Sequence, residues 1–259
     1  MTSLDSHLYI LRDNKRSEQV EVYDNNSYQL QHCLTVPGLD ITGDMVACAN
    51  DRCVYLSVSG DNSIHKIALS GDTIAHWPVN EHFTGLSFSL THGILVTCRH
   101  VRKIKEFSTD GQLLREVVLP DDVVSPWHSV QLSSGEFVVC HGSDNDPVSL
   151  HRVCLISSEG HVIKSFGGRR GSSSQEMNEP CHLAVDENEF VYVADSNNRR
   201  VLLLSPSLIF VRQVVSSEEL AWQPIAVHLD VSRRHLYVAD GDCQHCGRCA
   251  TGRVVIFSV

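Results

Sequence analysis

The sequence predicts an all-β fold, a six-bladed β-propeller of four-stranded antiparallel blades. Apolar and polar residues alternate over short runs, which is typical of strands. One stretch, VYVADSNNRRVLLLS at 191–205, aligns without a gap with ILVTCRHVRKIKEFS at 94–108. With these two, the sequence holds six copies of the pattern. Their equivalent residues are Tyr9, Tyr55, Leu95, Val138, Tyr192 and Tyr237, at spacings of 46, 40, 43, 54 and 45 residues. Periods of about 40–50 residues made of short strands are typical of propeller blades.

The blades are expected in chain order around the copies at 7–24, 53–70, 94–108, 136–157, 191–205 and 235–259. The fifth blade shows four strands, from the inner strand a to the outer strand d, at 181–186, 190–195, 200–205 and 210–215. The first blade has no clear inner strand before its copy, and the last ends on strand c. We therefore expect one propeller domain over 1–259 with incomplete strands at both termini.

Asp195 and Asp240 end strand b of the last two blades. Short Asp side chains commonly cap turns, so each is expected to accept hydrogen bonds from the backbone of its own b–c loop. The expected role of both carboxylates is structural.

The fifth blade carries a family resemblance. NEPCHLAVDENEFVYVADSNNRRVLLLS at 178–205 resembles an NHL repeat, in which a Pro precedes a small-apolar inner strand, an apolar run ends in Ala-Asp, and Asn-x-Arg follows. The preceding FGGRRGSSSQEMNEP resembles the Gly-rich loop between blades of that family. The resemblance implies a six-bladed propeller used as a binding platform, as in tripartite-motif proteins and their relatives.

Composition narrows the class of protein. A formal net charge of −10 disfavours broad nucleic-acid binding, and no apolar run approaches the roughly 20 residues of a membrane span. No export signal is visible, so we interpret the ten cysteines as reduced thiols and expect a cytoplasmic protein. Asn25 begins a glycosylation sequon, which would matter only in an exported protein.

The sharpest local motif is DCQHCGRCATG in the last b–c loop. Cys243, Cys246 and Cys249 form C-x2-C-x2-C, and His245 lies between them. Four such ligands could hold zinc, although structural zinc sites usually join two separated ligand pairs. We expect no resident cofactor and interpret these residues as loop thiols, with a zinc site as the alternative.

Histidines at the starts of inner strands raise the possibility of an enzyme. The region of His128 and His182 resembles propeller lyases in which histidines from three inner strands hold zinc. The expected equivalents of His128 are Thr84, Cys181 and Ile225, with His182 on the opposite face, so the resemblance supplies one ligand. Asp44 alone supplies a carboxylate, which is too few for a lactonase-type calcium site.

Basic residues recur in the b–c loops, which all emerge on one side of a propeller. The candidate partner-binding residues are Arg12, Lys15, Arg99, Arg102, Lys103, Arg199 and Arg200. Arg102 and Arg199 occupy the Arg position of the repeat and could instead brace neighbouring loops. Arg99, Lys103 and Arg200 flank that position, so we expect their replacement to leave stability nearly unchanged.

These observations favour a non-enzymatic binding or scaffold module that recognises an acidic protein on the b–c side, by family analogy in a ubiquitin-ligase context. Single-stranded RNA binding on the same side is one alternative, although aromatic residues are scarce there. A metal-dependent propeller enzyme of the lyase or lactonase type is the other.

Overall fold

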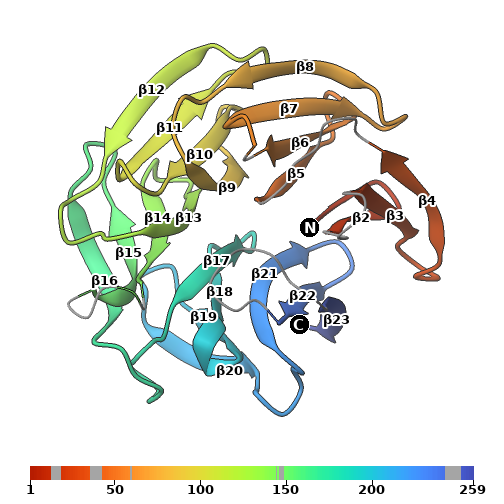
Figure 1. Ribbon diagram of the computed structural model, residues 1–259. Coiled ribbons are helices and arrows are strands. Elements are labelled where there is room, and N and C mark those ends of the chain that lie inside the picture. The colour runs from red at the N-terminus through yellow and green to blue at the C-terminus, as the bar shows by residue number, and fades with distance from the viewer. Residues whose placement is uncertain (13–18, 36–42, 59, 144, 146–148, 243–251) are drawn as a thin grey trace.

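Six antiparallel sheets are arranged as blades around a common centre in the computed structural model (Figure 1). The structure describes residues 1–12, 19–35, 43–58, 60–143, 145, 149–242 and 252–259. The predicted all-β, six-bladed propeller is confirmed. Within these ranges the one helix is the short η1 (Ser196–Asn198). No helix of the described residues is long and apolar enough to cross a membrane.

Each blade runs from an inner strand a at the centre to an outer strand on the rim (Figure 1). Blades 1 to 3 consist of β1 (Thr2–Leu4), β2 (His7–Arg12), β3 (Gln19–Asp24) and β4 (Leu30–Thr35); β5 (Met45–Cys48), β6 (Cys53–Val58), β7 (Ser63–Ala68) and β8 (Thr73–Pro78); and β9 (Phe83–Phe88), β10 (Ile94–Cys98), β11 (Lys103–Phe107) and β12 (Leu113–Val118). Blades 4 to 6 consist of β13 (Pro126–Gln131), β14 (Phe137–His141), β15 (His151–Ile156) and β16 (Val162–Gly168); β17 (Pro180–Val185), β18 (Val191–Asp195), β19 (Arg200–Leu204) and β20 (Phe210–Val215); and β21 (Gln223–Asp230), β22 (His235–Gly241) and β23 (Gly252–Ser258).

The two chain ends differ in how they complete their blades. Blade 1 has an inner strand, because β1 pairs with β2 from Thr2 opposite Tyr9 to Leu4 opposite His7. The expectation that this strand is missing was therefore wrong. The sequence did not reveal it because three residues are too few to show an alternating pattern. Among the described residues blade 6 has three strands and β23 pairs with β22 alone, so the predicted lack of an outer strand is confirmed for that part of the chain.

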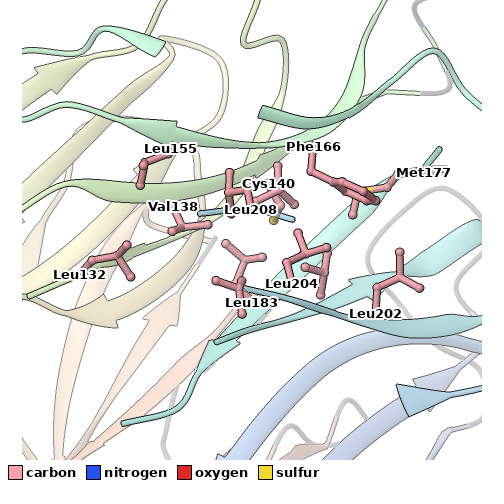
Figure 2. Close-up of a cluster of buried hydrophobic side chains, with 13 residues drawn as sticks. Leu132, Val138, Cys140, Leu155, Phe166, Met177, Leu183, Leu202, Leu204 and Leu208 are labelled. Atoms are coloured by element: carbon pink, nitrogen blue, oxygen red, sulfur yellow. The ribbon is translucent and has the colours of Figure 1, made fainter. Parts of the chain in front are cut away.

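The second strands of blades 2 to 5 are buried on both faces, because each blade is packed between two others. Every residue of β6, β10, β14 and β18 is buried, which explains why these copies read as nearly continuous apolar runs. Figure 2 shows the cluster between blades 4 and 5, where Leu183 and Leu204 lie close to Val138 and Leu155. Comparable clusters fill the other four junctions from blade 1 to blade 6.

The junction between blades 6 and 1 is polar among the described residues. Asn25 is 1% exposed and donates from Nδ2 to Oδ2 of Asp230 at 3.1 Å. The hydroxyl of Tyr237 donates to Oδ1 of the same Asn25 side chain, and Ser3 Oγ lies 2.7 Å from His228 Nε2. Side-chain hydrogen bonds thus close the ring here, and the Asn of the sequon is buried inside the fold.

Candidate functional site

A bulge sets the register of the inner strands in blades 4 and 5. Pro126 pairs with the last residue of β14 and Pro180 with the last residue of β18, and the register shifts by one residue before His128 and His182. Both histidines therefore occupy the same position and point the same way. The expectation that Cys181 is the equivalent of His128, and that His182 faces away, was wrong.

The same register corrects the other two blades. Gly85 of β9 pairs with Thr97, and Ala226 of β21 pairs with Ala239, so these residues are the equivalents of His128. The bulged residues have a different task. Thr84 Oγ1 donates to the carbonyl of Trp127 at 2.7 Å, and Cys181 Sγ to the carbonyl of Pro224 at 3.3 Å. They tie each inner strand to the next blade.

The corrected register brings two histidines to a buried carboxylate. Nε2 of His128 and Nε2 of His182 lie 3.2 Å and 3.3 Å from Oδ2 of Asp44. The imidazole rings are stacked, with centroids 4.0 Å apart. Asp44 directly precedes β5, so this group, the central cluster of Asp44, His128 and His182, joins residues of blades 2, 4 and 5.

Burial and hydrogen bonds decide the charges of the central cluster. Burial and, to a smaller extent, the nearby His128 lower the pKa of His182 to about 4, so the ring is neutral at neutral pH. Burial by itself would raise the pKa of Asp44, but contacts with His182 and His128 outweigh it and hold that pKa well below its usual range. The backbone amides of Met45 and Leu86 also donate to this carboxylate, at 2.8 and 3.0 Å. The cluster thus presents the anionic carboxylate of Asp44 to a neutral imidazole at His182.

The predicted binding cations are mostly engaged within the chain. Three form ion pairs: Arg12 with Glu21 at 2.9 Å, Arg102 with Asp121 at 2.6 Å, and Lys103 with Glu116 at 2.8 Å. Arg199 donates to the carbonyls of Ser217 and Leu220, between blades 5 and 6. Arg102 and Arg199 both have a left-handed backbone, with φ of 50° and 51°, which agrees with their shared place in the repeat.

Arg200 is buried, with 8% exposure, and Asp195 beside it has 0%. Nε of Arg200 donates to Oδ2 of Asp195 at 2.7 Å. The expectation that Arg200 is a replaceable surface residue was therefore wrong. Asp195 itself accepts the backbone amide of Asn178 at 2.7 Å, which belongs to the loop before the blade rather than to its own b–c loop.

A similar arrangement recurs at the end of the b–c hairpin in blades 4, 5 and 6. The side chain of the last or next-to-last residue of strand b accepts a hydrogen bond from an arginine directly opposite on strand c. The pairs are His141 with Arg152, Asp195 with Arg200, and Asp240 with Arg253. Asp240 also accepts the amide of Ala221 from the loop between blades. Residues 243–251 of its own b–c loop lie outside the described residues, so the expected cap there stays a prediction.

Arg99 differs from the other cations because it lies on an aromatic ring, besides interacting electrostatically with Glu179. Its guanidinium lies 3.7 Å from the ring centroid of Trp127. Two exposed histidines adjoin it: His82 and His100 have ring centroids 4.7 Å apart, and the amide of Arg99 donates to the carbonyl of His82. These four residues, His82, Arg99, His100 and Trp127, form what we call the blade-3 patch.

The remaining candidates lie outside the described residues. They are Lys15, Cys243, His245, Cys246 and Cys249. Their predicted roles, partner binding for the lysine and a possible zinc site for the other four, stay predictions.

No family model and no curated protein matches this sequence. Solved structures do match over most of the chain. A protein of unknown function from Bacteroides caccae is 14% identical over 86% of this chain and 79% of its own, with a TM-score of 0.66. Virginiamycin B lyase from Staphylococcus aureus is 13% identical over 85% and 70%, at 0.57, and hydrazine synthase from Kuenenia stuttgartiensis is 12% identical over 98% and 92%, at 0.65. At these identities the likeness shows the propeller fold, while membership of the NHL family stays a prediction.

Proposed function

We propose that this chain is a non-enzymatic binding module that recognises an acidic protein segment on its b–c side. The observation that carries the proposal is the blade-3 patch, where a cation stacked on an aromatic ring lies beside two exposed histidines. Arginine and tryptophan are the residue types that most often dominate binding energy at protein interfaces. The other predicted binding cations in the described residues form ion pairs or hydrogen bonds within the chain, so the guanidinium stacked on the ring makes the patch the favoured contact.

The stacked arrangement suits recognition for a physical reason. Trp127 donates from its indole nitrogen to the carbonyl of Gly142 at 3.0 Å, which fixes the ring. The ring in turn holds the guanidinium of Arg99 in one orientation, so little side-chain entropy is lost when a carboxylate binds. A fixed cation on a rigid scaffold is a good receptor for an acidic chain.

The resemblance of the fifth blade to an NHL repeat suggests a cellular context for this binding module. An NHL-like platform of the tripartite-motif type would act in the cytoplasm, in scaffolding or ubiquitin ligation. All the cysteines in the described residues are free thiols, which supports a reducing compartment.

Selection from a displayed library of disordered peptides tests the proposal. We expect the wild-type protein to enrich acidic peptides, Arg99→Glu to lose that enrichment, and Arg212→Glu to keep it. Arg212 is an exposed cation on the outer strand β20, so it matches the charge change away from the patch. Absence of acidic enrichment, or its survival in Arg99→Glu, would overturn the proposal. Tight binding of a single-stranded uridine oligonucleotide instead would favour the RNA alternative.

A second candidate function is a metal-dependent enzyme, and one observation favours it. The central cluster places two imidazoles and a carboxylate at one point, and propellers of this shape include proteins named as lyases. The test is whether the cluster binds a metal at all, because a metal-dependent lyase needs the ion before any substrate is considered.

A further inference from the structure

We propose that Asp44, His128 and His182 form a binding site for one divalent transition-metal ion of the zinc class at the centre of the propeller. The three residues come from blades 2, 4 and 5, and their candidate ligand atoms all lie within 4.8 Å of one another. This inference is independent of the blade-3 patch, so either proposal can fail without the other.

The spacing of the ligand atoms fits a metal polyhedron. Two ligands about 2.1 Å from one ion, subtending about 90–110°, are separated by about 3.0–3.4 Å. Oδ2 of Asp44 lies 3.2 Å from Nε2 of His128 and 3.3 Å from Nε2 of His182. Both separations therefore match the edge of a tetrahedral or octahedral site. The stacked rings would have to tilt so that both Nε2 atoms aim at the same ion.

Unsatisfied nitrogens supply the second observation. Both ring nitrogens of His182, and Nδ1 of His128, are buried without a hydrogen-bond partner of acceptable geometry. Buried polar atoms in native proteins nearly always have a partner, and an ion or a water is a common one when no protein atom serves. A metal held by Nε2 of His182 would satisfy the most poorly partnered side chain at the centre.

The carboxylate is already oriented for such a role. Met45 donates its amide to Oδ1 and Leu86 donates its amide to Oδ2, so the Asp44 side chain is fixed from both sides. Outer contacts of this kind hold metal ligands in place and are a regular part of metal sites. Gly85 leaves the room that His128 needs, because a Cβ there would lie 2.7 Å from Cδ2 of the ring.

The donor set defines the class of ion. Two imidazoles and one carboxylate suit Zn²⁺ or Fe²⁺ and their neighbours, whereas Ca²⁺ and Mg²⁺ prefer oxygen ligands. Three protein ligands also leave a position for water. In the described structure Nε2 of His128 lies 3.1 Å from the carbonyl of Leu86, so loading would move the proton of this imidazole to Nδ1. That change of tautomer is a specific consequence of binding.

A second cluster, Cys48, Asp51 and Cys53, is less suited to an ion. Asp51 Oδ2 already accepts from Nζ of Lys66 at 2.6 Å and from the hydroxyl of Tyr55 at 3.1 Å. A cation would have to enter beside the ammonium of Lys66, and the electrostatic repulsion disfavours it.

Titration of the purified, reduced full chain with Co²⁺ and Zn²⁺ tests the proposal. We expect about one equivalent bound at the centre, with affinity reduced by about 100-fold or more in both Asp44→Asn and His182→Asn. His182→Asn is the safer variant, because His182 makes no well-formed hydrogen bond that the substitution would lose. Thermal denaturation of each variant checks that the fold is intact.

Two control variants separate this site from competing ones. Cys246→Ser removes a ligand of the candidate thiol loop, and His82→Asn removes one histidine of the exposed His82–His100 pair; neither should change the equivalent bound at the centre. The Co²⁺ spectrum should lack thiolate charge-transfer bands, and the ¹⁵N spectrum of His128 should show a change of tautomer on loading with Zn²⁺. The proposal is overturned if no equivalent binds, if the bound equivalent keeps its affinity in folded His182→Asn, or if it is lost in either control.

Discussion

Replacing Arg200 with Met should destabilise the protein far more than its position in a surface hairpin would predict. The guanidinium pairs with Asp195 and also donates to the carbonyls of Ser172, Ser173 and Glu176 at 2.9, 3.0 and 2.7 Å. One side chain therefore joins strand c of blade 5 to the loop that enters the blade. Met keeps most of the aliphatic volume, so the change isolates the charge and its hydrogen bonds.

The expected loss follows from what remains behind. Breaking a buried ion pair by removing one partner costs about 3–5 kcal/mol, because the other charge stays buried. Asp195 would retain the amide of Asn178 and the side chain of Asn198, at 2.7 and 2.8 Å. We therefore expect a loss of about 3 kcal/mol, at the lower end of that range. Arg199→Met is the matched control, since Arg199 is exposed, and should cost less than about 1 kcal/mol.

A pH signature distinguishes this explanation from a simple packing defect. Burial raises the pKa of Asp195 above 3.8, and Arg200 opposes that shift. Without Arg200 the folded-state pKa rises further above the unfolded value, so the folded state takes up a proton first and gains stability as the pH falls. The loss in Arg200→Met should therefore be smaller near about pH 5 than near about pH 8.

Urea denaturation at both pH values measures these losses. The double variant Asp195→Asn with Arg200→Met should lose this pH dependence of the stability loss, because no carboxylate is left at this position to take up a proton. The reasoning is refuted if Arg200→Met costs no more than Arg199→Met, or if its loss is equal at both pH values.

Three further predictions concern His141, Gly85 and Asn25. Burial lowers the pKa of His141 from 6.5 to about 3, so the protein takes up a proton when it unfolds below pH 6.5. The free energy of unfolding should therefore fall toward pH 3 by up to about 1.4 kcal/mol per pH unit. Urea titrations of His141→Gln should show a weaker dependence of stability on pH. Gly85→Ala would place a Cβ 2.7 Å from the His128 ring, so it should cost about 1–3 kcal/mol and shift the imidazole resonances; unchanged resonances would contradict the packing. Asn25→Ala should cost about 1–3 kcal/mol and speed hydrogen exchange in blades 1 and 6 more than in blade 4, and a uniform effect would contradict a local role.

The fold could be predicted because its strongest signal repeats. Strands such as β10 and β18 are buried on both faces, so they produce continuous apolar runs that align without gaps. The short β1 left no such signal, since three residues cannot show a period. The spacing of 54 residues between Val138 and Tyr192 reflects longer connections and leaves the number of strands unchanged.

The central cluster could have been found, but not by aligning apolar positions alone. In blades 3 to 6 a bulge adds one residue to the start of the inner strand, which moves a side chain to the other face. The signal was Pro-x-His, present at both Pro126 and Pro180 and matched by Pro-x-Ala at Pro224. Aligning the prolines places His128 and His182 together. That Asp44 completes the group depends on packing across three blades, which the sequence does not display.

Arg200 shows a second limit of sequence reasoning. A charged residue after a polar turn is usually solvated, and nothing in RRVLLLS distinguishes Arg199 from Arg200. The distinction comes from the antiparallel register, in which Arg200 lies opposite Asp195 while Arg199 occupies the left-handed turn position. In blades 4 and 6 the same cross-strand position, opposite His141 and Asp240, is held by Arg152 and Arg253.

The closure of the ring has a consequence for the centre. Five junctions are filled by apolar clusters, whose stabilising free energy grows with the apolar area that they bury. The junction of blades 6 and 1 depends instead on hydrogen bonds, which contribute about 1 kcal/mol each. The weakest seam among the described residues therefore lies between the chain ends. Asp44, His128 and His182 belong to blades 2, 4 and 5, inside the arc joined by apolar clusters. If the ring opened between blades 6 and 1, these three residues would therefore stay together. The central cluster would then keep its arrangement for binding a ligand.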